Sequence, residues 1–318
     1  MNLFATVLTY PAPSANYRGE SELNRTIIQK VTDGRFDYPI ISPEAMRNAL
    51  REILAGYGLP SNRSRLHDEE QLSVTFADYP NPGKYVDDFF FGYLVAASNA
   101  DRKKIQKEVN RDDFTFKRDS VLRMNLAKGL EPYRHNAVFT QSPLAAEGSA
   151  YKNATTSALL HRETAVTPFQ YPFALNLNDC AEKPEWTRAL LKAIGELNEV
   201  AGNHARSYFE MAPASIVIRL TESLVAGYST YGFQKSKKTD NYEFPEVIDG
   251  ILHEEKGADG SMTASPDYPG SEFFIGGRIV REMSDEKIER LRAQGVTLDR
   301  DPRRLLETVA AKALGGSN

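Results

Sequence analysis

The fold is decided by the stretch from Asn16 to Leu54, which has the sequence NYRGESELNRTIIQKVTDGRFDYPIISPEAMRNALREIL. Its second half carries the start and stop signals of a helix. Ser42 suits the N-cap, and Pro43 fits the first helical position, where a missing N–H costs nothing. Gly56 ends the segment. Between them, apolar side chains recur at helical spacing at Met46, Ala49, Leu50, Ile53 and Leu54. We therefore predict an amphipathic helix that packs one face against a core.

Two arginines lie on one flank of this predicted helix. Arg47 and Arg51 are one turn apart, so both guanidinium groups can face the same way. The preceding loop is also basic, with Arg18, Arg25, Lys30 and Arg35. A helix N-terminus beside stacked arginines is suited to bind phosphate. The alternative is a capped helix whose arginines are merely solvated, and these residues alone leave both interpretations open.

The composition is that of a soluble globular protein. The chain has 318 residues, of which 41% are hydrophobic and 26% are charged. Cys180 is the single cysteine, which excludes a disulfide framework and a cysteine-based metal site. The N-terminal MNLFATVLTY is too short and uncharged for a signal peptide, and no apolar run is long enough to span a membrane. We expect a cytoplasmic protein with no membrane partner.

Charge is segregated along the chain. The formal net charge is −4, which by itself argues against a nucleic-acid partner. Residues 240–272, however, hold nine acids against Lys256 alone. That segment contributes −8, so the remainder carries +4. A locally basic face therefore remains compatible with the sequence.

The order of expected elements is typical of an α+β fold of the RRM or ferredoxin-like type with large insertions. We expect strands at residues 3–10, 120–126, 170–176 and 215–222, with a second helix from Pro184 to about Leu197. In the C-terminal third we expect a strand at residues 273–280 and helices near 286–293 and 302–314. Residues 11–42 are expected to form a long polar loop. Residues 127–165 are polar and show no core-building period, and such stretches are normally functional or disordered.

Signatures of enzymes are missing from the sequence. The five histidines have no metal-ligand spacing, and neither a phosphate-binding GxxxxGK[ST] nor a GxSxG nucleophile turn occurs. Asp33 and Asp37 are the acids best placed to attack a bound strand, but a turn at Asp33-Gly34 is the better explanation of them. We therefore expect no catalytic residue, no metal site and no cofactor.

Four tracts of the chain carry a resemblance to a known family. They are the loop and helix YRGESELNR…YPIISPEAMRNALR, then LEPYRHNAVF, then YPFALNL, and finally GNHARSYFEMAPASIVIRL. In this order and spacing they resemble the DevR-type CRISPR backbone protein of the RAMP superfamily. The resemblance covers residues 1 to about 225 and continues more weakly beyond. It implies a type I Cascade subunit, with type I-B as the expected subtype.

The resemblance also implies an architecture. An RRM-like palm would comprise residues 1–56 and 119–225, and a helical fingers insertion would comprise residues 57–118. A long β-hairpin, the thumb, would lie within the palm at residues 127–165. Residues 226–318 would form a C-terminal extension that packs on the palm.

The function implied by the resemblance is binding of guide RNA, the crRNA, by copies of the chain that polymerise head-to-tail along the spacer. Such a subunit holds RNA by its backbone, while base pairing supplies specificity for target DNA in antiviral defence or guided targeting. The implied partners are crRNA, target DNA through the RNA–DNA heteroduplex, and the large, small and 5′-handle-binding subunits of Cascade. The implied subunit is not an enzyme.

The resemblance assigns RNA-binding roles to eleven residues. Asn16 and Arg18 match the first loop of the family, while Ser42, Arg47 and Arg51 match its first helix. Arg123 and Met124 match a strand that presents a basic residue and an apolar wedge, although Met124 is equally well explained as core filler. The remaining four match the loop after the second helix, and they are Asn203, His204, Arg206 and Ser207.

Two other functions remain open at this level. A metal-dependent ribonuclease of the same superfamily would use an aspartate of the first loop, for which Asp33 is the candidate. An RRM-like module that binds DNA or protein on its own is the second alternative.

Overall fold

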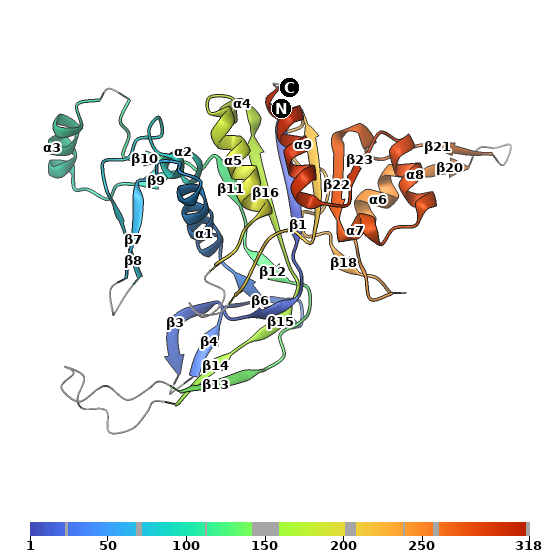
Figure 1. Cartoon of the computed structure of the whole chain (residues 1–318), viewed down its shortest axis with the longest axis horizontal. Helices are drawn as coiled ribbons and strands as arrows, with labels where there is room; N and C mark the ends of the chain where they lie inside the picture. Colours follow the sequence, from blue (N-terminus) through green and yellow to red (C-terminus); the bar gives the residue numbers. More distant parts are fainter. Residues whose placement is uncertain are drawn as a thin grey trace.

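The computed structural model describes residues 1–22, 25–67, 72–111, 113–141, 159–200, 208–237, 239–256 and 261–315. Its architecture is mixed α and β, built on a central, mostly antiparallel sheet, with smaller sheets projecting from it (Figure 1). Among the described residues, no helix is both long enough and apolar enough to cross a membrane.

The central sheet is organised around β1 (Asn2–Leu8), which is the expected first strand. It pairs antiparallel with β16 (Phe169–Asn176) on one side and with β17 (Ser215–Thr221) on the other. The strand order is β23-β22-β17-β1-β16-β12-β6-β5, with β11 also paired to β16. The other strands are β5 (Lys30–Asp33), β6 (Phe36–Ile41), β11 (Leu122–Met124), β12 (Ala127–Gly129), β22 (Phe273–Gly277) and β23 (Thr297–Asp299).

Each face of this sheet buries its own apolar core because successive side chains of a strand point to opposite faces. Leu3, Ala5 and Val7 face α1 (Pro43–Gly56), α5 (Pro184–Gly195) and α9 (Pro302–Leu314). Leu8 and Val217 face the opposite core, which is covered by helices of the C-terminal third. Those helices are α6 (Pro245–Ile251), α7 (Arg278–Arg281) and α8 (Asp285–Ala293).

The expected helices are confirmed, with shifts at their ends. α1 begins after Ser42 and ends at Gly56 as predicted. α5 starts at Pro184 but ends at Gly195, although Leu197 beyond it is still buried. The strand expected at residues 273–280 ends at Gly277, and its last three residues belong to α7. The short α4 (Leu177–Cys180) caps β16.

The expectation of a polar loop between residues 11 and 42 is wrong. This stretch contains β2 (Ala12–Ser14), β3 (Tyr17–Glu22) and β4 (Arg25–Ile28) in addition to β5 and β6. β2 pairs with β15 (Ala165–Thr167), and β4 pairs in parallel with β14 (Leu159–Glu163). Each partner is more than 100 residues away in the chain, so no local sequence pattern predicts the pairing.

A second sheet of four strands projects below the central one (Figure 1), and we call it the hairpin lobe. Its order is β13-β14-β4-β3, where β13 is Ala137–Gln141. β13 and β14 form an antiparallel hairpin in which Gln141 pairs with Leu159. Residues 127–165, which show no core-building period in the sequence, supply strands β12, β13 and β14, with residues 142–158 outside the described part.

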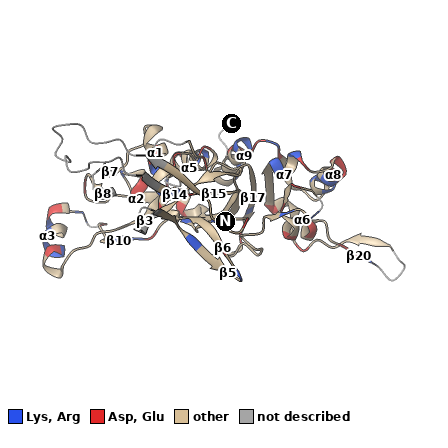
Figure 2. Cartoon of the chain, turned by 90° about the horizontal axis from the view of Figure 1, so that it is seen from below, with Lys and Arg blue, Asp and Glu red and all other residues tan. Residues whose placement is uncertain are grey.

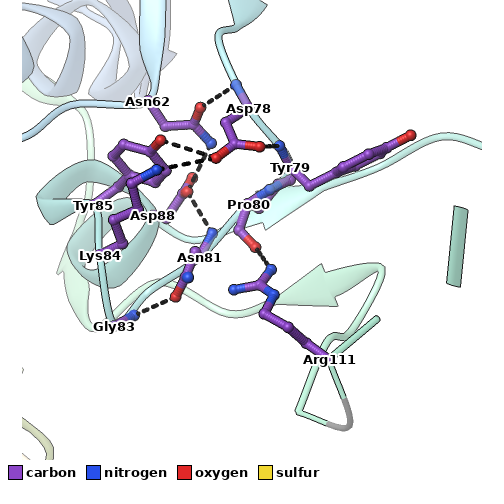
Figure 3. A network of polar contacts seen from close by, with 10 residues as sticks. All are labelled: Asn62, Asp78, Tyr79, Pro80, Asn81, Gly83, Lys84, Tyr85, Asp88 and Arg111. Atoms are coloured by element: carbon purple, nitrogen blue, oxygen red, sulfur yellow. Dashed lines mark hydrogen bonds and ion pairs between the residues drawn. The ribbon is translucent and has the colours of Figure 1, made fainter. Parts of the chain in front are cut away.

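Residues 57–118 form a separate projection that combines helices with short strand pairs. Its elements are β7 (Arg63–His67), β8 (Leu72–Phe76), α2 (Val86–Phe91), β9 (Tyr93–Leu94), α3 (Asn99–Val109) and β10 (Lys117–Arg118). Its base is held by a buried polar network in which the Asp88 carboxylate accepts hydrogen bonds from Asn62 Nδ2 and Asn81 N, both at 2.8 Å (Figure 3). Burial raises the pKa of Asp88 above its usual value.

The C-terminal third also carries two small hairpins and a 3₁₀ turn, Gly270–Glu272. The hairpins pair β18 (Gln234–Lys235) with β19 (Tyr242–Glu243), and β20 (Glu254–Lys256) with β21 (Met262–Ala264). The second hairpin extends from the end of the molecule opposite α3 (Figures 1 and 2). α3 and α8 carry charges of both signs (Figure 2), so neither of these helices is uniformly basic or acidic.

Candidate nucleic-acid interface

The N-terminus of α1 has the geometry that the sequence predicts. The Ser42 hydroxyl accepts a hydrogen bond from the backbone N–H of Ala45 at 3.2 Å, and Pro43 occupies the first turn. Asn16 is 6% exposed, and its side-chain Nδ2 donates to the carbonyl of Ile40 at 3.1 Å. Asn16 therefore fixes the strand that leads into α1, which sets the direction of the helix N-terminus.

The expectation that Arg51 lies on an exposed helix flank is wrong. Its side chain is 7% exposed, and Nε lies 3.3 Å from the carboxylate of Asp87, which is completely buried in α2. The guanidinium also donates to Asn48 Oδ1 at 2.6 Å and lies over the ring of Phe91. The packing of α2 against α1 turns this flank inward, so Arg51 joins the two helices and is not proposed as an RNA contact.

Arg47, one turn before Arg51, has a different environment. It is half-buried, and its Nε has no hydrogen-bond partner within the described residues. No acidic side chain of the described part forms an ion pair with it, in contrast to Arg51 and Asp87. Arg47 is thus the member of the pair that has no acidic partner among the described residues.

Arg123 and Met124 lie on opposite faces of the sheet because they are neighbours on strand β11. Met124 is 8% exposed and belongs to the core under α1, so its interpretation as a wedge against bases is wrong. Arg123 is exposed on the other face, opposite Ala174 of β16. It lines a cavity of about 470 Å³ together with Arg118 and Asp179.

The remaining assigned residues lie wholly or partly outside the described part. Asn203, His204, Arg206 and Ser207 fall within residues 201–207, which the structure does not describe. The backbone of Arg18 belongs to β3, but its side chain is not described. The structure therefore brings together Asn16, Ser42 and Arg47 around the start of α1.

Two basic residues near this region are paired with acids, and one of them, Lys128, was missed by the sequence analysis. Lys128 on β12 forms an ion pair with Asp33 and lies 4.5 Å from the ring centroid of Tyr38. Lys30 Nζ lies 3.6 Å from the carboxylate of Glu163, which is almost completely buried at the base of the hairpin lobe. The alternation in Ala127-Lys128-Gly129 is a signal that could have found Lys128. Lys30 was named as part of the basic loop, but no local signal could have found its pairing with Glu163, because the two residues are far apart in the chain.

The fold is that of chains in solved CRISPR surveillance assemblies. One such structure, "CRISPR RNA-guided surveillance complex, pre-nicking", contains a chain that matches with a TM-score of 0.59 and 12% identity, covering 98% of this chain and 100% of that one. A second, "CRISPR RNA-guided surveillance complex", matches with a TM-score of 0.54 and 11% identity over the same shares.

At the level of sequence, the chain is 28% identical over 304 residues to a curated protein of Myxococcus xanthus (strain DK1622) named "CRISPR-associated protein Cas7/Cst2/DevR". The match covers 91% of this chain and 90% of the relative. No family model matches. The resemblance to DevR-type CRISPR-associated proteins that the sequence motifs indicate is thereby confirmed.

Proposed function

We propose that this chain is a crRNA-binding backbone subunit of a type I CRISPR surveillance complex, of subtype I-B. The observation that carries the proposal is the similarity to the Cas7/Cst2/DevR protein over nine tenths of both chains. The fold shared with chains of RNA-guided surveillance complexes over nearly the whole length supports it. Copies polymerise head-to-tail along the spacer, which then pairs with target DNA.

In this proposal the central sheet with its helices is the RRM-like palm, residues 57–118 are the fingers, and the hairpin lobe carries the thumb. The RNA crosses the N-terminus of α1, where free backbone N–H groups and the charge of Arg47 meet its phosphates. Contacts to the backbone suit a subunit that must accept any guide sequence, because phosphates carry no sequence information. Heterologous contacts between copies generate an open helical assembly.

Purification from cells that express a CRISPR array tests RNA binding directly. The proposal predicts that the protein carries RNA of one fixed length and that the assembly loses its high mass after ribonuclease treatment. A monomeric protein free of RNA under these conditions would refute the proposed function and favour an RRM-like module that acts alone.

The salt dependence of binding tests the role of Arg47. Each phosphate contact on a single strand contributes roughly 0.7 to the slope of log affinity against log salt. Arg47→Ala should reduce the slope by about that amount and weaken unrelated guide sequences alike. Arg188→Ala is a matched control because this arginine of α5 is half-buried like Arg47 but pairs with Glu185. A sequence-selective loss in Arg47→Ala would contradict contacts to the RNA backbone.

The hairpin lobe offers a test of polymerisation. Gln141 pairs with Leu159, so residues 142–158 can be replaced by Asn-Gly, which closes a two-residue hairpin without changing the register. We expect the shortened chain to fold and to lose assembly on guide RNA. Deletion of the complete stretch from Ala137 to Thr164 is less selective, because it also removes β14 from its pairing with β4. Normal assembly of the shortened chain would contradict the thumb assignment.

We propose that the subunit is not a nuclease. Asp33 lies at the end of β5, and its carboxylate is paired with Lys128. We therefore expect neither the wild type nor Asp33→Ala to cleave the RNA of a guide–target mixture in the presence of Mg²⁺ or Mn²⁺. Metal-dependent cleavage of target RNA by the wild type, lost in Asp33→Ala, would establish the ribonuclease alternative instead.

A further inference from the structure

A cavity of about 590 Å³ lies where β1, α5, α7 and α9 meet, and the residues assigned to RNA binding do not account for it. Tyr10 follows β1 and forms one wall, with 45% of its surface exposed. Arg281, the last residue of α7, donates from Nη2 to the Tyr10 hydroxyl at 2.6 Å. This hydrogen bond fixes the plane of an exposed aromatic ring at the mouth of the cavity.

The charges of the lining restrict what the cavity can hold. The lining holds three acidic residues, Glu196, Glu210 and Asp301, and two arginines, Arg281 and Arg303. A phosphate inside the cavity would lie among more negative than positive groups, which is unfavourable. A neutral, planar group with N–H donors along its edge suits the same lining, because carboxylates accept hydrogen bonds.

The carboxylates already have partners within the chain, which weakens their attraction for a cation. Glu196 accepts a hydrogen bond from the hydroxyl of Tyr57 at 2.6 Å, and this contact helps to raise the pKa of Tyr57. Asp301 caps α9 by accepting from the N–H of Arg303 at 2.9 Å. Arg281, by contrast, forms no ion pair with an acidic residue of the described part, and its guanidinium contacts the Tyr10 hydroxyl in the lining of the cavity.

A second exposed aromatic side chain lies beside the cavity. Tyr208 is 80% exposed, and its hydroxyl donates to Glu210 at 2.9 Å. Asn198 and Glu210, which both line the cavity, are joined by a β-bridge. Exposed aromatic rings next to an arginine without an acidic partner are the arrangement on which single-stranded nucleic acids stack their bases.

We infer that this cavity is a nucleobase slot, in which one base of the bound single strand stacks on Tyr10 while the adjoining phosphate lies at Arg281. The slot rests on the proposed function, since it needs a single strand at this end of the sheet. The edge of the base meets Glu196 and Glu210 through its amino groups. Every base can stack, but uracil lacks an exocyclic amino group, so it binds less tightly than adenine or cytosine.

Fluorescence anisotropy with short single-stranded RNA tests the slot. Tyr10→Ala should raise the Kd for oligoadenylate roughly 5- to 150-fold, which corresponds to the usual contribution of one stacked base. Tyr10→Phe should stay closer to the wild type because it keeps the ring. Phe76→Ala is the matched control, since Phe76 is also an exposed aromatic, 39% accessible, on the distant strand β8.

An abasic strand of equal length separates a base contact from a phosphate contact. Tyr10→Ala should not weaken binding of that strand, whereas Arg281→Ala should weaken both strands. Ultraviolet crosslinking followed by mass spectrometry should attach oligoadenylate to the peptide that contains Tyr10. Tyr10 and Arg281 both have exposed side chains, so we expect their alanine variants to keep the melting temperature of the wild type. That result would exclude unfolding as the cause of weaker binding.

The outcomes distinguish failure of the slot from failure of the proposed function. Wild-type protein that does not bind RNA refutes the function. Wild-type protein that binds RNA, with Tyr10→Ala and Arg281→Ala binding equally well, refutes the slot alone. Equal losses of the abasic and the normal strand in Tyr10→Ala also refute the slot, because the ring would then act on the backbone. Saturable binding of an arginine-rich peptide that oligoadenylate does not displace would assign the cavity to a protein partner and overturn the inference.

Discussion

Replacement of Arg51 by methionine should destabilise the protein far more than its place on a helix flank suggests. The substitution keeps most of the apolar volume but leaves the carboxylate of Asp87 buried without a countercharge. Removing one member of a buried ion pair costs about 3–5 kcal/mol, against about 0–1 kcal/mol for an exposed pair. In the variant, the Asp87 carboxylate still accepts hydrogen bonds from the backbone N–H groups of Asn62 at 2.8 Å and Arg63 at 3.0 Å. We therefore expect a cost at the lower end of the range for a buried pair, about 3 kcal/mol.

This free energy converts into a measurable shift. With an unfolding entropy of about 2.1 cal/mol/K per residue over the chain, a loss of about 3 kcal/mol lowers the Tm by about 4–5 °C. Differential scanning calorimetry and urea unfolding give the two quantities independently. Arg47→Met is the matched control one turn away, and we expect it to change the stability by less than about 1 kcal/mol. Arg51→Met combined with Asp87→Asn should be more stable than Arg51→Met alone, because no buried charge is left unpaired. A loss below about 1 kcal/mol in Arg51→Met would refute the reasoning.

Three further outcomes are expected. Ser42→Ala should lower the free energy of unfolding in urea by about 1 kcal/mol, because it removes the cap of α1. Ser42→Asp should keep most of the wild-type stability, and an alanine variant as stable as the wild type would contradict the cap. Met124→Ala should lower the free energy of unfolding by about 2–5 kcal/mol because the Met124 side chain fills the core. A change near zero would contradict the burial of Met124. Burial raises the pKa of the Cys180 thiol to about 11, so the reactive thiolate is scarce in the folded protein until the pH approaches that value. Iodoacetamide at pH 8 should therefore label Cys180 only after unfolding, and rapid labelling of the folded protein would contradict this assignment.

The elements found from the sequence are those whose signals are local. α1 has its cap, its proline, its apolar stripe and its terminal glycine within fifteen residues, and each of these determines a backbone position directly. β1 is apolar on both alternating faces, which indicates the doubly covered strand that the structure contains.

The elements missed are those whose partners are remote. β4 and β14 are short strands that gain their stability from each other across more than 130 residues, so Thr26 and Ile28 carry no sign of pairing by themselves. Arg47 and Arg51 lie on the same flank of a helical wheel, so the sequence alone does not distinguish their roles. The packing of α2, which brings Asp87 against Arg51, gives Arg51 a structural role.

The position of β1 at the middle of the central sheet has a consequence for synthesis. This strand is made before its neighbours β16 and β17, which begin at Phe169 and end at Thr221. At about 5–20 residues per second, roughly 10–45 s pass before both edges of β1 can be paired. During that interval an apolar strand with two open edges has no partner, and such strands are prone to aggregation. The hairpin lobe and the projection at residues 57–118 are therefore made before the sheet that carries them can close, so no copy can bind guide RNA until most of the chain has left the ribosome.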